Sequence, residues 1–553
     1  MASSSPSSSD QLVAFLVRLQ HEALATLGPK GFDPKLYVDL PLKTDLSAAE
    51  SAFARLPRSP EGVIPAPDLE RFLDEYFDKP ESDLVHVEPV DFTPEPEGFL
   101  PNVENPRVRD WALKVHSRWK DLSRRVADKV RERPERHTLL PLPSPVIIPG
   151  LRFREVYYWD SYWIVRGLLV SKMYDTAKGI VNNLISLIET YGHVLNGART
   201  YYSSRSQPPL LSSMVYDIYK RTEDLEFVKK AYPSLLKEYS FWVSDVHKVI
   251  IRDVQGHEHS LCRYQAMWNK PRPESATIDE QSASKLLTPS QKAKFYHEIA
   301  SGAESGWDFS SRWMRLNSSD LTTIATTSII PVDLNTFMYK MELDISEFAR
   351  LLGDETTSKK FLKASKARQA AIKSILWNSN MKQWLDYWLI SKSNCEEVYN
   401  WQAECQSHNV FASNFIPLWV KAYDSVEEVL ESLQRSELIQ EVGIATSLSN
   451  TGQQWDFPNG WAPLQHLIVE GLAYSGSKEA KSVAEDIAKR WIKTNYAAYR
   501  ITGAMHEKYD VTECGKPGGG GEYKPQTGFG WSNGVVLAFL EAFGWPRDRE
   551  IDC

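Results

Sequence analysis

The sequence predicts an all-α protein in which about a dozen helices form a closed double ring with long loops at one end. Apolar residues recur at spacings of three and four along most of the chain, which is the period of an amphipathic helix. Strands and helices do not alternate regularly, and this argues against a doubly wound sheet or a TIM barrel. The alternative all-α architecture, an open solenoid, needs a self-similar repeat of about 34 to 47 residues, and none is recognisable.

Helical patterns begin at Asp10, and the polar, serine-rich residues 1–9 are expected to form a disordered tail. A long helix, ended by Pro134, is expected where one face carries Trp111, Val115, Trp119, Leu122, Val126 and Val130. A second such face carries Ala177, Ile180, Val181, Leu184, Ile185 and Ile188. Further helices are predicted near residues 209–220, 225–247, 331–352, 358–377, 408–423, 426–438, 461–474, 478–495 and 532–543.

One β-hairpin is predicted across Val249–Leu261, with its turn at Gly256. The proline-rich stretch from Pro141 to Pro149 indicates a spacer after an N-terminal helical extension of about residues 10–140. Because the composition does not change across this spacer, we expect residues 10–553 to form a single domain.

Composition and charge exclude several classes of partner. The 553 residues are 42% hydrophobic and 25% charged, as in a soluble globular protein. The net charge of −8 argues against nucleic acid or an anionic membrane as a partner. No run of 18 or more apolar residues predicts a membrane span, and the N-terminus lacks the pattern of a secretory signal. We therefore expect a soluble, cytoplasmic protein, or an extracellular or plasma-membrane-associated one if the native N-terminus is longer.

The cysteines and histidines give no metal or cofactor pattern. Five scattered cysteines, without a C-x-x-C pair, are too few for a disulfide framework, and their odd number favours a reducing compartment. The sequence contains no H-E-x-x-H, G-x-S-x-G, phosphate-loop or dinucleotide motif, and His257-Glu258-His259 is only a weak metal pattern. No metal or organic cofactor is expected. Asn317-Ser318-Ser319 is a glycosylation sequon.

Six polar and aromatic clusters occupy the expected loops. Their residues are 149–163, 196–209, 268–274, 304–313, 453–463 and a C-terminal stretch that contains 506–510 and 518–531. In the last of these, four glycines precede Glu522, and such a run is expected where backbone must approach another group closely. Carboxylates and arginines set among aromatic rings suit a flat, hydroxylated ligand, so the leading candidate is a carbohydrate.

Glycosidic bond hydrolysis needs one protonated and one ionised carboxyl group on opposite faces of a sugar. Asp308 lies between Trp307 and Phe309, a setting that raises the pKa of a carboxyl and suits a general acid. Glu507 and Glu522 are both candidates for the base. The candidate sugar contacts are arginines Arg152, Arg205 and Arg272, polar residues Asn196, Gln207 and Glu274, and aromatic platforms Phe153, Trp159 and Trp455.

These motifs closely resemble the trehalases of glycoside hydrolase family 37, most of all the plant members. One family signature matches Pro149 to Tyr162, except that Leu151 replaces a glycine beside Arg152. Another matches Gln454 to Pro463 without a departure, and the glycine-rich stretch from Gly518 to Gly534 also fits. The resemblance extends from about residue 12 to residue 546, with six matching motifs in the same order.

The resemblance implies an (α/α)6 toroid and an inverting hydrolysis of α,α-trehalose to one α-glucose and one β-glucose. Asp308 matches the general acid and Glu507 the general base, which leaves Glu522 as a supporting or sugar-contacting carboxylate. The implied substrate-binding residues are Arg152, Phe153, Tyr157, Trp159, Asp160, Asn196, Arg205, Gln207, Arg272, Glu274, Trp455 and Glu522. The alternatives are a related α-glucoside hydrolase or phosphorylase on the same toroid, and a non-catalytic disaccharide sensor.

Overall fold

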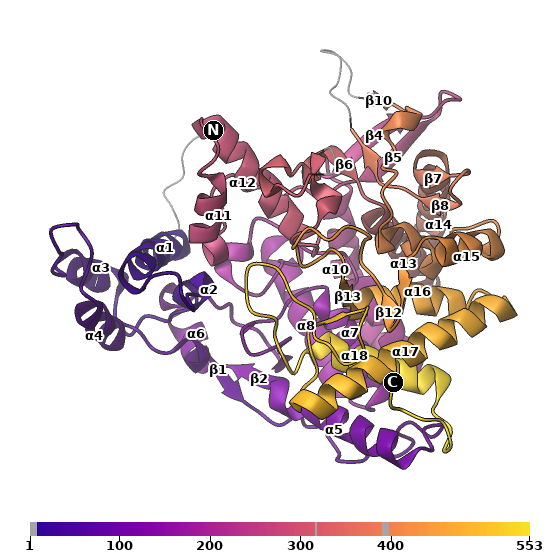
Figure 1. Ribbon diagram of the computed structural model, residues 1–553, viewed down its shortest axis with the longest axis horizontal. Coiled ribbons are helices and arrows are strands. Elements are labelled where there is room, and N and C mark those ends of the chain that lie inside the picture. The colour runs from indigo at the N-terminus through magenta and orange to yellow at the C-terminus, as the bar shows by residue number, and fades with distance from the viewer. Residues whose placement is uncertain (1–7, 316–317, 390–397) are drawn as a thin grey trace.

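The computed structural model describes residues 8–315, 318–389 and 398–553, and most of the elements within these ranges are helical (Figure 1). The N-terminal helices are α1 Ser8–Leu27, α2 Pro34–Val38, α3 Leu46–Ala54, α4 Ala66–Tyr76, α5 Pro106–Leu122 and α6 Asp128–Glu132. The remaining α-helices are α7 Asp160–Val170, α8 Tyr174–Tyr191, α9 Leu211–Thr222, α10 Leu225–Trp242, α11 Ala276–Ala283, α12 Pro289–Glu304, α13 Val332–Leu351, α14 Glu355–Ala371, α15 Val426–Arg435, α16 Ala462–Ala473, α17 Lys478–Thr502 and α18 Gly530–Phe543.

Six helical segments pack against one another in succession and form the centre of the molecule. They are α7, α9, α13, the 3₁₀ segment η11 Ala412–Val420, α16 and α18, and α18 packs back on α7. Nearly every residue of α7, η11 and α16 is buried, as expected for helices covered on all sides. Each of these six segments also packs against at least one helix of a further set: α5, α8, α10, α14, α15 and α17.

Strands occur in the described ranges only as short pieces in sheets of two or three strands. The three-stranded sheets are β1 Leu84–His86, β2 Ser123–Val126 and β3 Val146–Ile147, and then β10 Val398–Asn400, β4 Lys248–Arg252 and β5 Glu258–Cys262. The paired strands are β6 Ile329–Ile330 with β9 Tyr387–Trp388, β7 Trp377–Asn378 with β8 Gln383–Trp384, β11 Ile439–Gln440 with β12 Gly443–Ile444, and β13 Asn459–Trp461 with β14 Lys508–Asp510.

Local patterns predicted several of these elements closely. The expected apolar face of residues 177–188 is the buried face of α8, and the β4–β5 hairpin turns at Gly256 with a φ of 87°. The stretch near 408–423 is wound as a 3₁₀ segment with Pro417 inside, because proline cannot continue the α-helical hydrogen bonds.

Three expectations about local structure were wrong. The helix expected through Val130 ends at Leu122, because residues 123–126 instead pair with β1 and β3 on both edges. Helix α1 begins at Ser8, within the stretch expected to be a disordered tail. Cys514 and Cys553 form a disulfide, although no disulfide was expected. The sequon at Asn317 lies outside the described residues.

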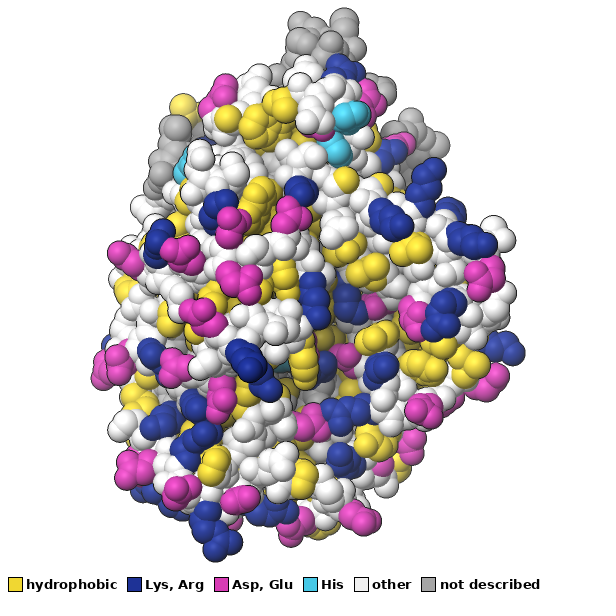
Figure 2. All heavy atoms as spheres, turned by 90° about the vertical axis from the view of Figure 1, so that its right-hand side faces the viewer, with side chains coloured by type: hydrophobic (Ala, Val, Ile, Leu, Met, Phe, Trp, Pro, Cys, Tyr) yellow, Lys and Arg dark blue, Asp and Glu magenta, His cyan; other side chains and the backbone are white. Residues whose placement is uncertain are grey.

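The N-terminal helices α1–α4 lie at one side of the molecule in Figure 1, where α1 contacts α2, α4 and α11. The face shown in Figure 2 carries acidic and basic side chains interspersed over most of its area. Among the described residues, the structure contains no helix long and apolar enough to cross a membrane.

Candidate active site

All of the candidate residues predicted from the sequence line a single pocket. The pocket comprises about 720 Å³ of space free of protein atoms, including the part that opens to solvent. Its walls come from the loops before α7, between α8 and α9, around α11, after α12, before α16 and on both sides of the glycine run. The chain also supplies wall residues that were not predicted: Lys35, Tyr202, Ser275, Ala303, Gly306, Gln454, Trp461, Tyr523, Phe529 and Trp531.

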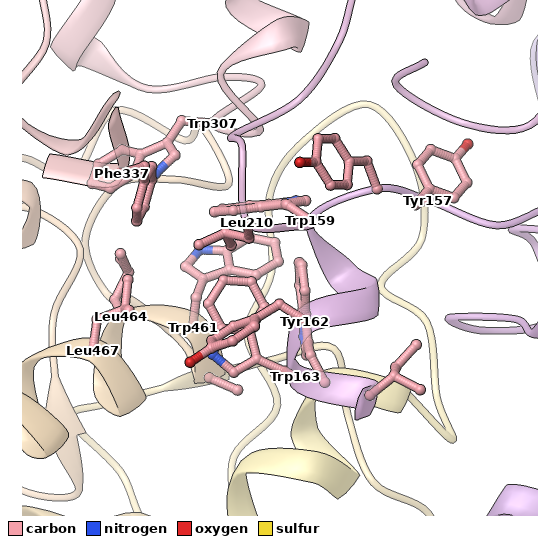
Figure 3. Close-up of a cluster of buried hydrophobic side chains, with 14 of the residues drawn as sticks. Tyr157, Trp159, Tyr162, Trp163, Leu210, Trp307, Phe337, Trp461, Leu464 and Leu467 are labelled. Atoms are coloured by element: carbon pink, nitrogen blue, oxygen red, sulfur yellow. The ribbon is translucent and has the colours of Figure 1, made fainter. Parts of the chain in front are cut away.

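Stacked tryptophans form the floor of this pocket, and Figure 3 shows part of the cluster beneath Trp159. The rings of Trp455 and Trp461 are parallel, with centroids 4.0 Å apart, and Trp307 stacks on Trp455 at 5.3 Å. Trp455, the expected sugar platform, lines the pocket with a buried side chain whose ring stacks against those of Trp461 and Trp307. This stacking fixes the orientation of its ring.

Asp308 follows α12 on a loop that is fixed by another carboxylate. Asp456 accepts hydrogen bonds from the Ser310 hydroxyl at 2.9 Å and from the Ser311 backbone N–H at 2.8 Å. Burial raises the pKa of Asp308 to about 7; Arg272 opposes this rise, and the negative charge of Glu522 adds to it. At neutral pH a substantial fraction of Asp308 therefore carries a proton.

Glu507 lies immediately before β14, and its backbone and side chain are both held. Its backbone N–H donates to Gln526 O at 3.0 Å, and its carbonyl accepts from the Trp531 indole N–H at 2.9 Å. Its carboxylate accepts from the Tyr523 hydroxyl at 2.6 Å and from the Gln526 backbone N–H at 3.1 Å. These two donors hold the carboxylate in one orientation.

The three predicted arginines are each paired with a carboxylate at the pocket wall. Arg272 binds Asp279 at 2.7 Å and Glu522 at 2.9 Å, so Glu522 faces a cation as well as the pocket. Arg205 pairs with Glu274. Arg152 makes a two-pronged contact with Asp33, with Nε–Oδ2 at 2.9 Å and Nη2–Oδ1 at 2.8 Å.

The predicted amides hold backbone in place around the pocket. Gln207 accepts a hydrogen bond from the Trp159 backbone N–H at 3.1 Å, and Asn196 donates to Ser206 O at 3.2 Å. Asp160, the first residue of α7, is buried, and burial together with the charges of Glu507 and Asp308 raises its pKa. Within the described ranges, no group of three or more His, Cys, Asp or Glu side chains is placed to bind a metal ion.

A family model described as trehalase matches residues 30–544. The chain belongs to the trehalase family. A probable trehalase of Oryza sativa subsp. japonica is 63% identical to it, over 98% of both chains. A trehalase of Arabidopsis thaliana is 58% identical, over 98% of this chain and 87% of the relative. The solved neutral trehalase Nth1 of Saccharomyces cerevisiae superposes with a TM-score of 0.58 at 27% identity, covering 72% of this chain and 73% of that one. These identities confirm the resemblance to plant members.

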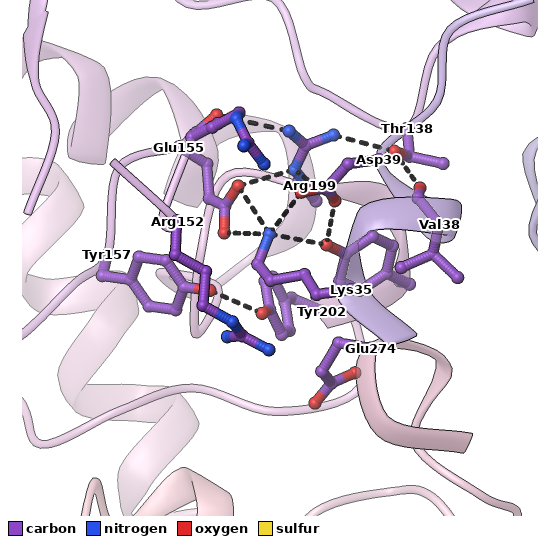
Figure 4. A network of polar contacts seen from close by, with 12 residues as sticks. Lys35, Val38, Asp39, Thr138, Arg152, Glu155, Tyr157, Arg199, Tyr202 and Glu274 are labelled. Atoms are coloured by element: carbon purple, nitrogen blue, oxygen red, sulfur yellow. Dashed lines mark hydrogen bonds and ion pairs between the residues drawn. The ribbon is translucent and has the colours of Figure 1, made fainter. Parts of the chain in front are cut away.

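In this member of the trehalase family, the N-terminal helices contribute to the pocket from far away in the sequence. Figure 4 shows Lys35 of α2 within a buried network with Asp39, Glu155 and Arg199. The Lys35 ammonium lies 2.7 Å from Asp39 and 2.8 Å from Glu155, and Arg199 binds Glu155 at 2.7 Å. Each cation is thereby matched by a carboxylate, and the network fixes the loop that carries Arg152 and Tyr157.

Gln20 of α1 connects the start of α2 to the segment just before α11. Its side-chain amide donates to Pro34 O at 2.9 Å and to Pro273 O at 3.0 Å, and it accepts from the Thr277 N–H at 3.0 Å. No local pattern pointed to Gln20 or Lys35, whereas Tyr202, Trp461 and Tyr523 lie inside the polar and aromatic clusters and could have been included.

The glycine run of this trehalase-family chain allows a close approach of backbone, as its composition suggested. Gly520 and Gly521 adopt φ angles of 77° and 88°, which favour glycine. A Cβ atom on Gly520 would lie 2.6 Å from Gly452 O, and one on Gly521 would lie 2.8 Å from the Gln454 side chain. The glycine run therefore allows the loop that carries Glu522 to pack closely against the loop that carries Gln454 and Trp455.

Proposed function

We propose that this protein hydrolyses α,α-trehalose to one α-glucose and one β-glucose by general acid and base catalysis with inversion. Membership of the trehalase family supports trehalose as the substrate and glycoside hydrolysis as the reaction. The observation that carries the proposal is that Asp308 and Glu507 line one pocket together with every candidate sugar-binding residue.

Asp308 is the general acid of this mechanism. It donates its proton to the bridging oxygen as the bond from that oxygen to the anomeric carbon breaks, and the bonding electrons stay on the oxygen. The leaving unit departs as α-glucose. The raised pKa of Asp308 supports this role, because the carboxyl must be protonated before the bond breaks.

Glu507 is the general base. It accepts a proton from a water molecule whose oxygen bonds to the anomeric carbon from the opposite face, which yields β-glucose. The Tyr523 hydroxyl and the Gln526 N–H hold the carboxylate in one orientation for this step. Room for the water requires roughly 6.5–9.5 Å between the two carboxyl groups. Arg152, Arg205 and Arg272 bind the sugar hydroxyls and balance the negative charge of the pocket.

The fold that we propose for this chemistry is an (α/α)6 toroid. Support comes from the unbroken series of packed helices α7, α9, α13, η11, α16 and α18, of which the last contacts the first. Each of the six has an outer helix packed on it, which is the expected arrangement of a double ring. The loops that form the pocket then belong to one end of the ring.

The test of this function is proton NMR of the protein with trehalose in phosphate-free buffer, recorded before mutarotation mixes the glucose anomers. We expect equal early signals of α- and β-glucose. Formation of α-glucose alone would indicate retention and contradict the role of Glu507 as base. A requirement for phosphate with release of a glucose phosphate would indicate a phosphorylase, and the absence of any product would favour a sensor.

The pH dependence of the reaction should follow the ionisation of Asp308. Because the acid must be protonated, kcat/KM should fall as the pH rises through the Asp308 pKa of about 7. Glu522 contributes to this raised pKa through its negative charge, so Glu522→Gln should move the alkaline limb to lower pH. The measurement is the pH profile of kcat/KM beside Glu347→Gln, a surface control on α13. An alkaline limb that stays in place in Glu522→Gln would contradict this coupling.

A further inference from the structure

Lys508 differs from every other buried cation in the described part of the chain. Its side chain lies on β14 directly after Glu507 and is 0% exposed, yet no carboxylate in these residues forms an ion pair with it. Carboxylates at 3.0 Å or less pair with the other buried cations, which are Lys35, Arg199, Arg205, Arg272, Arg312 and Arg368. Burial of an unpaired charge is costly, so its presence here requires a cause.

Neutral groups surround the Lys508 ammonium. It donates to the Gln454 side-chain oxygen at 2.7 Å and to Gly520 O at 3.4 Å. It lies 4.8 Å from the ring centre of Trp461, the residue opposite Lys508 in the β13–β14 pair, and 5.9 Å from that of Tyr523. The Lys508 ammonium is therefore held by contacts with Trp461 of β13, with Gly520 of the glycine run and with Gln454 of the loop before α16.

The negative charges that act on Lys508 are those of the two carboxyl groups of the proposed mechanism. Burial lowers the Lys508 pKa to about 8, and Glu507 and Asp308 both oppose this change. A further connection runs through Gln454, whose amide N–H donates to Asp308 O at 2.5 Å while its oxygen accepts from Lys508. The ammonium thus remains charged at neutral pH and is tied to the Asp308 backbone by a single side chain.

We propose that Lys508 is a positioning residue whose ammonium serves as the shared counter-charge of Asp308 and Glu507. The inference rests on the proposed function and extends it. Before reaction the negative charge is on Glu507; afterwards Glu507 holds a proton and the charge is on Asp308. A fixed cation that acts on both carboxyl groups stabilises either arrangement, so that the transfer of charge across the pocket costs less.

The other charged groups near the two carboxyl groups stay in place when Lys508 is replaced. Those facing them from the surrounding elements are Arg152, Asp160, Arg205, Arg272, Glu522 and the Tyr523 hydroxyl. A change in pH dependence after replacement of Lys508 alone is therefore assignable to the lost ammonium.

Three replacements separate charge from hydrogen bonding. Lys508→Met removes both, Lys508→Gln retains an N–H donor for Gln454 without the charge, and Lys508→Arg retains the charge. We expect Lys508→Met and Lys508→Gln to lower kcat about tenfold or more with a smaller effect on KM. Loss of the cation makes ionisation of Asp308 less favourable, so the alkaline limb of the pH profile should move to higher pH by about half a unit or more. Lys508→Arg should keep the wild-type limbs.

The matched control is Lys516→Met, because Lys516 lies on the next turn with a half-exposed side chain that pairs with Asp510 and Glu513. Wild-type pH limbs in both neutral variants would overturn the inference, as would an equal shift in Lys508→Arg. If Lys508→Met and Lys508→Gln failed to fold, as measured by thermal unfolding, the inference would also be overturned. Lys508 would then be required for the structure itself. If the wild-type protein released no glucose from trehalose, the proposed function itself would fail, so the two failures are distinguishable.

Discussion

The Asp308→Asn variant is expected to lose at least about 1,000-fold in kcat on trehalose. The amide has nearly the shape of the carboxyl but no proton to donate, so the bridging oxygen must leave as an unprotonated alkoxide. α-Glucosyl fluoride needs no such protonation because fluoride is a good leaving group. Hydrolysis of this second substrate should therefore fall far less, and the ratio of the two rates measures the role of Asp308 as acid.

Asp424→Asn, on an exposed residue that pairs with Lys373, is the control for Asp308→Asn and should behave as the wild type. The hydrogen bonds from Ser310 and Ser311 to Asp456 remain in the Asp308 variant, so its thermal unfolding should be little changed. Near-normal trehalose turnover, or an equal loss on both substrates, would show that Asp308 is not the acid.

The Glu507→Gln variant should lose turnover by a similar factor, but on both substrates. The amide oxygen can still accept the hydrogen bond from Tyr523, while the Gln526 N–H loses its acceptor and the side chain can no longer take a proton from water. Trehalose binding, followed by tryptophan fluorescence, should change only a few-fold because the rest of the pocket is intact.

Glu431→Gln on the surface of α15 provides the matched control for Glu507→Gln. Retained hydrolysis of α-glucosyl fluoride in Glu507→Gln would contradict the assignment, because water attack is required for that substrate too. The two variants therefore assign the two roles independently. The acid is identified by a loss of turnover that depends on the substrate, and the base by a loss that is the same on both substrates.

The sequence predicted the structure best in segments whose conformation is determined by the spacing of their own residues. The apolar face of α8 and the turn at Gly256 follow from spacing and from the conformational freedom of glycine. The helix expected through Val130 ends early because residues 123–126 pair with strand residues 38 to 42 positions earlier and 22 to 24 positions later. The periodicity of apolar residues does not reveal such pairing. At residues 123–126, pairing with distant strands therefore outweighed the helical spacing of the apolar residues.

The pocket was predictable to the extent that its residues cluster in the chain. Each loop rich in carboxylates, arginines and rings reaches the same cavity, because side chains of that kind are not stable in a core without partners. Lys35 was not predictable, since it lies outside the polar and aromatic clusters and its partner Glu155 is 120 positions away. The Cys514–Cys553 pair was missed for the same reason, being 39 residues apart in the sequence.

Gln20 belongs to the first helix, yet each of its three hydrogen bonds ends on a backbone group beside the pocket. Removal of α1 would leave Pro34 O, Pro273 O and the Thr277 N–H without the hydrogen bonds that Gln20 supplies. We therefore expect that shortened versions of the protein beginning after α1 would lose the positions of Lys35 and Glu274 in the pocket wall before losing any of the six central helical segments. Helix α1, which lies on the same side of Figure 1 as α2–α4, therefore helps to hold two loops of the pocket in place.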